Sequence, residues 1–363
     1  MKNYYLLEQL RKEYNVTVVV ISSELLDDSK KKYFDRFNSY YYFYKSKYSF
    51  VKNSLRALLS LRSPIQVELY YFKDIQNKIM ELSSKHDLFF CNLVRTARYL
   101  ESVNNHKYCD MADSIGQNYK KSFKTVSSKF LSLYYFFEYP RLLKYEQHVI
   151  DTFDNVFLFN QTEIEYFTNQ EKIKYIPHGV NSELLEYPIK DKETKTLAFL
   201  GKMDYQPNID AVNWFVNNVM PKLPNDFVLK IIGAKPTPDV IDLANDRILV
   251  TGFVDDPYAI VKSCDVAIAP MVSGGGIQNK VLETLALGMA NIVSPLAALP
   301  MRDIKNNEHL IIANDVTEWV ESIIRVTTDR KCREFLEEEG RKFIKQNHTW
   351  DIAFANYQKV LTN

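Results

Sequence analysis

A chain of 363 residues is longer than most single compact cores and suits two domains of ordinary size. Hydrophobic residues make up 46% and charged residues 25% of it, so the composition excludes a disordered chain. The net charge is +1, split into +6 over residues 1–180 and −5 over residues 181–363. This modest asymmetry argues against a dedicated nucleic-acid binder, which would be strongly basic.

Neither the cysteines nor the first residues indicate an exported protein. Four cysteines lie far apart without a C-x-x-C pair, which predicts a reducing compartment and no structural metal. The start, MKNYYLLEQLRKEYNV, has charges every few residues and lacks the apolar core of a signal peptide. The apolar stretch at 130–143 is too short and interrupted to span a bilayer. We therefore expect a cytoplasmic protein.

The N-terminal half opens on an expected amphipathic helix, Tyr4 to Tyr14, and continues with four expected strands. These are 15–21 (NVTVVVI), 87–92 (DLFFCN), 107–113 (KYCDMAD) and 155–160 (NVFLFN). Helical segments between them predict a Rossmann-like domain over residues 1–180. Such a domain usually opens on a strand. We therefore expect that its first strand is absent, or that the true start lies upstream.

Residues 30–62 form a basic and aromatic tract. They carry nine basic and ten aromatic residues against one acidic residue. Basic side chains interleaved with aromatic ones favour an anionic bilayer interface, here the inner face of the membrane, which a lipid-linked acceptor would require. Single-stranded nucleic acid can use the same chemistry, but no RNA-binding motif accompanies the tract. The alternative is a tyrosine-rich surface helix and strand edge.

The C-terminal half alternates β-rich runs with segments of helical length, after a boundary that we place over residues 176–195. The expected strands are 196–201 (TLAFLG), 228–233 (VLKIIG), 248–254 (ILVTGFV), 265–270 (DVAIAP) and 291–295 (NIVSP). They are continuous apolar runs, which are typical of a parallel sheet covered on both faces. The sequence predicts a doubly wound α/β domain over residues 190–345.

Glycine and proline end several of these strands. Gly201, Gly233 and Pro270 would lie at the carboxyl edge of the sheet, where doubly wound sheets bind ligands. Simple punctuation of strand ends is the alternative explanation. Their occurrence at one edge favours a site.

The stretch SGGGIQNKVLETLALG, residues 273–288, joins a glycine loop to a helix that Gly288 should end. Such a loop offers open backbone N–H groups at the positive end of a helix, which together bind phosphate. Lys280 adds a cation, and Glu283 adds an acceptor for ribose hydroxyls; both head groups should lean toward the loop. The alternative is a plain loop with a surface pair of Lys280 and Glu283. The loop residues expected to bind are Gly274, Gly275, Gly276 and Ile277.

Four segments of the C-terminal half carry a family likeness. They are 199–224, 231–240, 250–271 and 274–288 (GGGIQNKVLETLALG). In this order they resemble the retaining glycosyltransferases of family 4, and within that group most nearly the exosortase-associated sugar transferases. In the N-terminal half, LVRTARYL (93–100), DMADS (110–114) and RLLKYEQ (141–147) match more thinly. The resemblance implies a GT-B fold, in which two facing Rossmann-like domains hold the acceptor (N-terminal) and the nucleotide sugar (C-terminal).

The resemblance also implies roles for single residues. Glu283 is similar to the second glutamate of the family's E-x7-E motif, which holds the nucleotide ribose. Gly275 stands where the first glutamate would be, so recognition of the sugar hydroxyls stays unassigned. Lys202 matches the place of a basic residue on the diphosphate, where charge develops on the leaving group; a solvated lysine is the alternative. Phe253 and Val254 fall where the nucleobase packs, or else in ordinary core.

In the N-terminal half, the polar residues expected to face the cleft are Arg95, Asp110, Asp113 and His178. Retaining transfer in this fold is thought to use the leaving phosphate to help deprotonate the acceptor, so the resemblance implies no dedicated base. Substrate contact and a structural pair remain equally open for Arg95 and Asp113. A turn-capping role is favoured for His178.

The family's final helix typically crosses back to the N-terminal domain. Residues 349–363 are the candidate, with Trp350 as an apolar anchor, and an ordinary capping helix is the alternative.

The sequence therefore predicts a metal-independent GT-B glycosyltransferase without a cofactor. It would move a sugar, with retention, from a UDP- or GDP-linked donor to a glycan or lipid-linked acceptor in cell-surface polysaccharide or glycoconjugate synthesis. One rival is a catalytically silent GT-B protein that binds a nucleotide sugar or a partner, which Gly275 and the missing strand favour. The other is a sugar-nucleotide epimerase, for which six scattered histidines supply no acid–base set.

Overall fold

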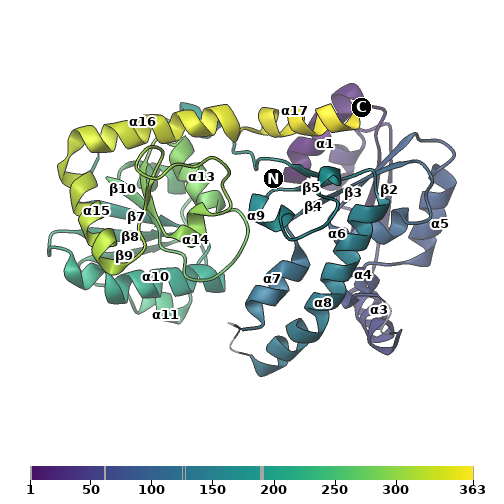
Figure 1. Ribbon diagram of the computed structural model, residues 1–363, viewed down its shortest axis with the longest axis horizontal. Helices are drawn as coiled ribbons and strands as arrows, with labels where there is room; N and C mark the ends of the chain where they lie inside the picture. The colour runs from purple at the N-terminus through teal and green to yellow at the C-terminus, as the bar shows by residue number, and fades with distance from the viewer. Residues whose placement is uncertain (1, 61–62, 125, 127, 189–191, 363) are drawn as a thin grey trace. The chain divides into compact units, whose positions relative to one another are not determined.

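The computed structural model describes residues 2–60, 63–124, 126, 128–188 and 192–362, and these divide into two compact units. The N-terminal unit comprises the chain up to Leu158, Glu163–Ile176 and the residues from Tyr357 on. The C-terminal unit comprises Phe159–Thr162 and Pro177–Asn356. Residues 189–191 of the expected boundary stretch and residues 61–62 of the basic and aromatic tract lie outside the described residues. Figure 1 shows the elements of both units.

The N-terminal half contains, in chain order, α1 (Lys2–Glu13), β1 (Thr17–Ser22), α2 (Asp28–Phe34), β2 (Ser39–Tyr44), α3 (Lys47–Ser60), α4 (Ile65–Leu69), α5 (Lys73–Leu82), β3 (Leu88–Asn92), α6 (Val94–Ala97), η1 (Arg98–Leu100), β4 (His106–Ala112), α7 (Ile115–Ser122), α8 (Lys129–Thr152), β5 (Asn155–Leu158), α9 (Gln161–Ile164), η2 (Gln170–Lys172) and β6 (Ile173–Tyr175). The expected first helix and all four expected strands are present.

The strands of this unit form two separate parallel sheets. Strands β3, β4, β5 and β6 form one sheet in sequence order, and β1 pairs with β2. The sequence did not predict β2 as a separate strand, and β6 was also missed. Both are hard to recognise, because β2 is a tyrosine run without alternation and β6 has three residues. The core of the unit lies around β3–β6, with Val19 of β1 and Tyr41 of β2 packed against it.

The C-terminal half contains η3 (Ser182–Glu186), β7 (Thr196–Leu200), α10 (Gln206–Asn218), η4 (Met220–Lys222), β8 (Val228–Ile232), α11 (Pro238–Ile241), β9 (Ile248–Gly252), α12 (Pro257–Lys262), β10 (Val266–Ala269), α13 (Asn279–Ala286), β11 (Ala290–Val293), α14 (Pro295–Ala298), β12 (Ile311–Ile312), α15 (Val316–Thr328), α16 (Arg330–Asn347) and α17 (Trp350–Leu361). All five expected strands are present, and the two-residue strand β12 was missed.

The sheet of the C-terminal unit has the order β12-β11-β10-β7-β8-β9, and each of these pairs is parallel. Renumbered from β7, this is the order 3-2-1-4-5-6 of a doubly wound dinucleotide-binding sheet. The central strands β7 and β10 are buried along their whole length between helices, which explains why their sequences are continuously apolar. The strand order reverses between β7 and β10, and at such a switch point the following loops diverge and leave a crevice for a ligand.

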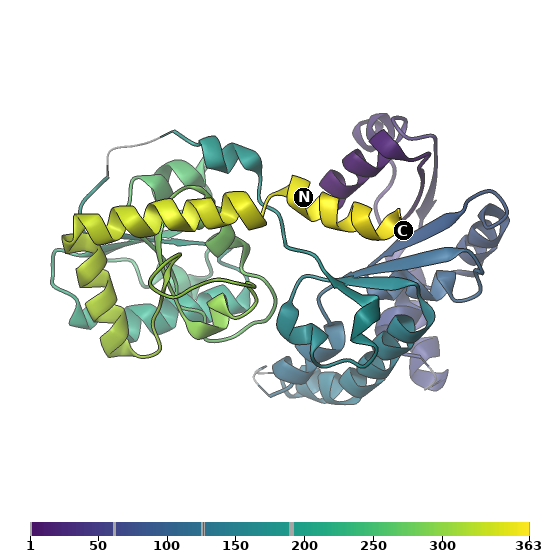
Figure 2. The same ribbon diagram turned by 45° about the horizontal axis from the view of Figure 1, so that its top comes forward.

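The last helix, α17, begins in the C-terminal unit and ends in the N-terminal unit. At its start, the Trp350 ring lies 5.0 Å from the ring of His178, and a side chain on Gly179 would collide with Trp350. At its end, the Tyr357 hydroxyl donates to Asp110 Oδ2 at 2.7 Å. Figure 2 shows the end of α17 beside α1, where Gln358 donates to Glu13.

This packing corrects the expectation for Asp110. Its side chain is fully buried in β4, where Lys2 forms an ion pair with it at 2.9 Å and Tyr357 donates to it. A carboxylate with these partners holds α1 and the end of α17 onto the sheet, so Asp110 does not line a cleft. His178 is likewise packed, because its ring meets Phe159 and its carbonyl oxygen accepts from His348 Nδ1.

Candidate functional site

The loop after β7 carries the first pair of expected site residues. Gly201 N–H donates to the carbonyl oxygen of Ile232, and Met203 N–H donates to that of Ala234, so this loop pairs with the loop after β8. A Cβ atom on Gly233 would lie 1.8 Å from the carbonyl oxygen of Gly201. Only glycine allows the two loops to approach this closely. Both predicted glycines therefore lie where two turns meet at the carboxyl edge of the sheet.

Asn208, in the first turn of α10, connects this turn to α13. Its Nδ2 donates to the carbonyl oxygen of Lys202 at 2.8 Å, and its Oδ1 accepts from Lys280 Nζ at 2.5 Å. The side chain is buried, and a Cβ atom on Gly201 would approach its Nδ2 to 2.8 Å. Sequence reasoning missed Asn208. The only signal was a polar residue next to Ile209 on a helix that otherwise packs on the sheet.

The glycine loop lies against the same helix. Ser273 Oγ donates to Asp210 Oδ2 at 2.7 Å, and a Cβ atom on Gly274 would lie 3.2 Å from Pro207 Cβ. Gly274 has φ +99° and Gly276 has φ +74°, conformations that favour glycine. The N-cap residue of α13, Gln278, makes no side-chain hydrogen bond to the helix. The first N–H groups of α13 are therefore left without a side-chain cap, as an anion site requires.

Lys280 is partly buried in apolar surroundings. Its Nζ lies 3.2 Å from the sulfur of Met271 and 4.9 Å from the centre of the Phe199 ring. Burial lowers the pKa of Lys280 to about 8, although the nearby Glu283 opposes this shift. A cation held in so little water interacts strongly with an incoming anion.

Glu283 lies one turn further along α13 and is also partly buried. Burial raises its pKa to about 7, although the Tyr258 hydroxyl, which donates to it, and Lys280 both favour the charged form. The alternative interpretation, a surface pair of Lys280 and Glu283, is therefore wrong. Lys280 bonds to α10, and Glu283 bonds to α12. Tyr258, at the start of α12, is a second residue that sequence reasoning missed.

The remaining predicted residues of the C-terminal unit differ in their exposure. Lys202 is 59% exposed and forms an ion pair with Asp204 at 3.1 Å. Ion pairs that are this exposed to water contribute little to stability. Phe253 is 75% exposed in the turn after β9, so the core alternative is wrong for it. Val254 beside it is partly buried against the core. Gly288 ends α13 as predicted, with φ +67° and Met289 N–H donating to the carbonyl oxygen of Thr284.

Arg95 and Asp113 lie in the N-terminal unit, each three residues beyond the paired positions Asn92 of β3 and Asp110 of β4. They form no ion pair with each other in the part of the chain that the structure describes. Arg95 has its guanidinium 5.5 Å from the Tyr70 ring, and its Nε is buried without a hydrogen-bond partner. Asp113 Oδ1 is also buried and unpartnered, and burial raises the pKa of this carboxyl.

Two buried glutamates accept hydrogen bonds from Ser114, the residue after Asp113, and sequence reasoning missed both. Glu146 of α8 accepts from Ser114 Oγ at 2.6 Å, and Glu163 accepts from Ser114 N–H at 2.6 Å. Burial raises the pKa of Glu146 to about 7 and that of Glu163 to about 8. They hold the start of α7 in place.

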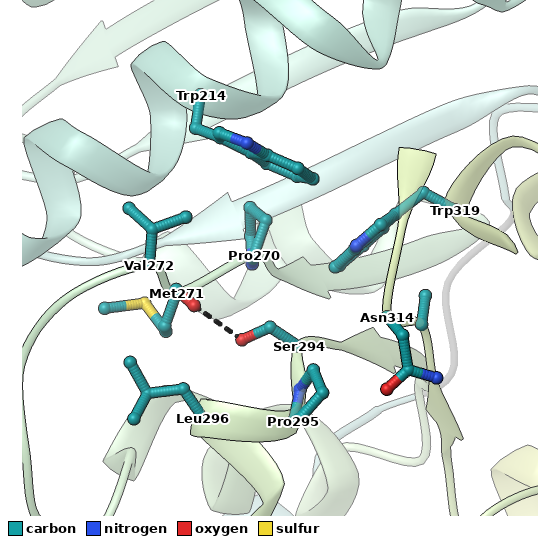
Figure 3. Close-up of a pocket in the computed structure, with 10 residues that line it drawn as sticks. Trp214, Pro270, Met271, Val272, Ser294, Pro295, Leu296, Asn314 and Trp319 are labelled. Carbon is teal, nitrogen blue, oxygen red and sulfur yellow. Dashed lines mark hydrogen bonds between the residues drawn. The ribbon is translucent and has the colours of Figure 1, made fainter. Parts of the chain in front are cut away.

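A cavity of about 370 Å³ lies at the carboxyl ends of β10, β11 and β12, where residues 270–272 form part of its wall. In Figure 3, Trp214 and Trp319 close one side of it, and Pro295 and Leu296 lie opposite. Ser294 Oγ already donates to the carbonyl oxygen of Met271 at 2.7 Å. The cavity thus adjoins the glycine loop through Met271 but, apart from Pro270 at its strand end, contains none of the predicted site residues.

With this geometry established, the comparison with known proteins is decisive for the fold. Residues 194–329, which include every element from β7 to α15, match the family Glycosyl transferases group 1. The C-terminal unit carries a glycosyl transferases group 1 domain. An uncharacterized glycosyltransferase of Methanocaldococcus jannaschii is 24% identical over 212 residues. That match covers 54% of this chain and 54% of the relative, so the chain spans about half the length of the curated relative.

Solved structures share the architecture of the whole chain. A glycosyltransferase from Rickettsia africae superposes with a TM-score of 0.66 at 12% identity, covering 100% of this chain and 94% of that one. The Anabaena protein Alr3699/HepE, crystallised with UDP and glucose, superposes with a TM-score of 0.66 at 11% identity, covering 99% and 94%. The fold is GT-B, as the sequence predicted.

Proposed function

We propose that this GT-B chain is a glycosyltransferase that takes a sugar from a UDP- or GDP-linked donor. One observation carries the proposal: Asn208 joins the turn after β7 to Lys280 at the point where the sheet order reverses. Open backbone N–H groups and a partly buried cation meet there, which is the chemistry a diphosphate requires. The group 1 domain and the UDP bound by the Anabaena protein support the same assignment.

In this proposal the donor extends outward from the diphosphate. Lys280 and the N–H groups of residues 274–277 bind the phosphates, and Lys202 leaves Asp204 to neutralise charge on the departing diphosphate. The Glu283 carboxylate exchanges the Tyr258 hydroxyl for ribose hydroxyls. The exposed Phe253 ring, with Val254 beneath it, stacks on the nucleobase. These protein groups supply the charge that the transfer requires, so we propose that it proceeds without a metal ion.

The acceptor half of the proposal rests on the N-terminal unit. Arg95 and Asp113 follow neighbouring strands of one sheet and carry buried polar atoms without partners, so we assign them to the acceptor. The acceptor we propose is a glycan or lipid-linked glycan of cell-surface polysaccharide or glycoconjugate synthesis, with retention at the sugar carbon.

We also propose that residues 30–62 contact an anionic membrane peripherally. Part of this tract packs inward, since Tyr41 and Phe43 of β2 lie against the core. Tyr48, Val51 and Leu55 of α3 remain exposed on one helical face. No helix within the described part of the chain has the length and apolar character to cross a bilayer.

The test is nucleotide binding by wild type and by Glu283→Gln. Calorimetric titration with UDP, GDP, ADP and CMP should select one of the first two bases. Glu283→Gln should weaken that binding by roughly 10- to 100-fold, because hydrogen bonds to a charged acceptor are worth about 1.5–3 kcal/mol. Glu321→Gln, on the exposed surface of α15, is the matched control. Equal affinities for both variants, or no binding of any nucleotide, would contradict the proposal.

A further inference from the structure

The start of α8 exposes a cluster of large apolar side chains, which we call the aromatic tip. Its members are Phe130, Leu131, Leu133, Phe136 and Phe137, each between 39% and 79% exposed. Single exposed apolar residues are normal on a protein surface, but a contiguous set marks an interaction site. Phe130, Leu133 and Phe137 follow helical spacing, so they share one face of α8.

The aromatic tip is exposed because the other face of α8 is already occupied. Helices α7 and α8 pack side by side (Figures 1 and 2), with Tyr119 4.4 Å from Tyr135 and Phe123 stacked on Tyr139. Ser132 Oγ donates to the carbonyl oxygen of Phe123 at 2.6 Å. Rotating α8 to bury the tip would break these contacts. The exposed face is therefore a built feature of the helix pair.

The segment that carries the aromatic tip has charges of one sign. Residues 115–137 contain four lysines and no acidic residue. Lys120, Lys121, Lys124 and Lys129 are all exposed. The first acidic residue after this segment, Glu138, is buried, where it accepts from Ile65 N–H. Lys124 and Lys129 line a hollow together with Leu133 and Phe136 of the tip. Aromatic and aliphatic groups beside lysines match a bilayer with anionic headgroups, since the rings enter the headgroup boundary while the ammonium groups stay outside.

We propose that the aromatic tip, with Lys124 and Lys129 beside it, docks this chain onto an anionic lipid bilayer. This surface lies outside residues 30–62 and deepens the membrane contact proposed above. It does not depend on sugar transfer. Docking here would hold the N-terminal unit, to which we assign the acceptor, at the membrane surface where a lipid-linked acceptor resides.

The test is co-sedimentation of the full chain with phosphatidylcholine vesicles, with and without phosphatidylglycerol, in the absence of nucleotide. Wild type should bind only the anionic vesicles. The double variant Phe130→Ser/Phe137→Ser should bind at least about tenfold more weakly, because each ring loses its apolar burial. Lys124→Glu/Lys129→Glu should also lose about tenfold or more. Both pairs are exposed, so neither change disturbs the core.

Matched controls separate this surface from general effects. Phe335→Ser and Lys222→Glu change exposed residues of the C-terminal unit and should bind vesicles like wild type. Tyr48→Ser/Leu55→Ser reports on α3 of the 30–62 tract alone. No binding by wild type, or equal losses in control and tip variants, would overturn the proposal. Concentration-dependent self-association that Phe130→Ser/Phe137→Ser abolishes would assign the tip to a second copy of the chain instead. Nucleotide titration of the same variants tests the proposed donor site separately.

Discussion

Asn208 Oδ1 accepts a hydrogen bond from Lys280 Nζ at 2.5 Å, across 72 positions of sequence. The same amide donates through Nδ2 to the carbonyl oxygen of Lys202. One buried side chain therefore sets the distance between the turn after β7 and the cation of α13. The geometry of the candidate donor site therefore depends on this link.

Asn208→Ala should disrupt the site and the fold together. It leaves the partly buried Lys280 ammonium without its oxygen acceptor, which should cost about 1–3 kcal/mol of unfolding free energy. Nucleotide affinity should fall by at least about tenfold, because Lys280 and the Lys202 turn lose their common support. Urea unfolding and nucleotide titration measure the two effects. Asn218→Ala, at the exposed end of the same helix, removes one bond to Trp214 and should change neither. If Asn208→Ala were as stable as Asn218→Ala, the proposed role of Asn208 in linking the two elements would be refuted.

Nucleotide affinity should decline as the pH rises through about 8. Burial lowers the pKa of Lys280 to about that value, so the free protein loses the cation there. Lys280→Arg keeps its charge at higher pH and should flatten the decline, whereas Lys280→Met should bind weakly at every pH. Titrations across the alkaline range check this. A decline of equal size in Lys280→Met would assign the pH dependence to another group.

The same shift predicts an alkaline gain in stability. Because the folded pKa of Lys280 lies below that of the unfolded chain, the unfolded state binds more protons between about pH 8 and 10.5. The contribution of Lys280 to unfolding free energy therefore rises with pH across that window. Lys280→Met should lack this contribution, which a difference between the two pH profiles of thermal unfolding would reveal.

Glu163 should behave in the opposite sense. Burial raises its pKa from 4.5 to about 8, so its protonated form stabilises the folded state at low pH. That contribution is complete below about pH 4.5 and is lost as the pH rises through 8. Glu163→Gln should therefore exceed wild type in stability above pH 8 by at least about 1.4 kcal/mol, the value of one pKa unit. Glu165→Gln, on the exposed side of the same turn, is the control. If stability depended on pH in the same way in both variants, the raised pKa of Glu163 would be contradicted.

Gly233→Ala should be far more damaging than Gly252→Ala. A methyl group at Gly233 would overlap the Gly201 carbonyl oxygen, so the paired turns must separate, at more than about 2 kcal/mol. Gly252 has φ +68°, but a Cβ atom there would meet nothing within 4 Å, so only backbone strain of about 1–2 kcal/mol applies. Thermal unfolding compares them. Equal losses would mean that close approach of the two turns is not what requires glycine.

The sequence alone determined the strands β7 to β11 of the C-terminal unit, and it predicted a candidate site there. Strands buried on both faces are mostly apolar, so TLAFLG, VLKIIG and DVAIAP were recognisable without a structure. The glycine loop and the helix end at Gly288 were equally recognisable, because left-handed backbone favours glycine. The prediction of the strands in the N-terminal unit was less complete, because the tyrosine run of β2 lacks the alternation that marks a strand.

Only the tertiary structure decided which polar groups meet. Asp110 stands in a motif that resembles a site, yet Lys2 and Tyr357, from opposite ends of the chain, make it part of the core. Asn208 and Tyr258 carry too little local signal to be recognised, because their roles arise from bonds to Lys280 and Glu283 across long separations. Periodicity is a property of neighbouring residues and survives in the sequence. Burial, pKa shifts and hydrogen-bond partners depend on contacts between distant segments, which exist only once the chain has folded.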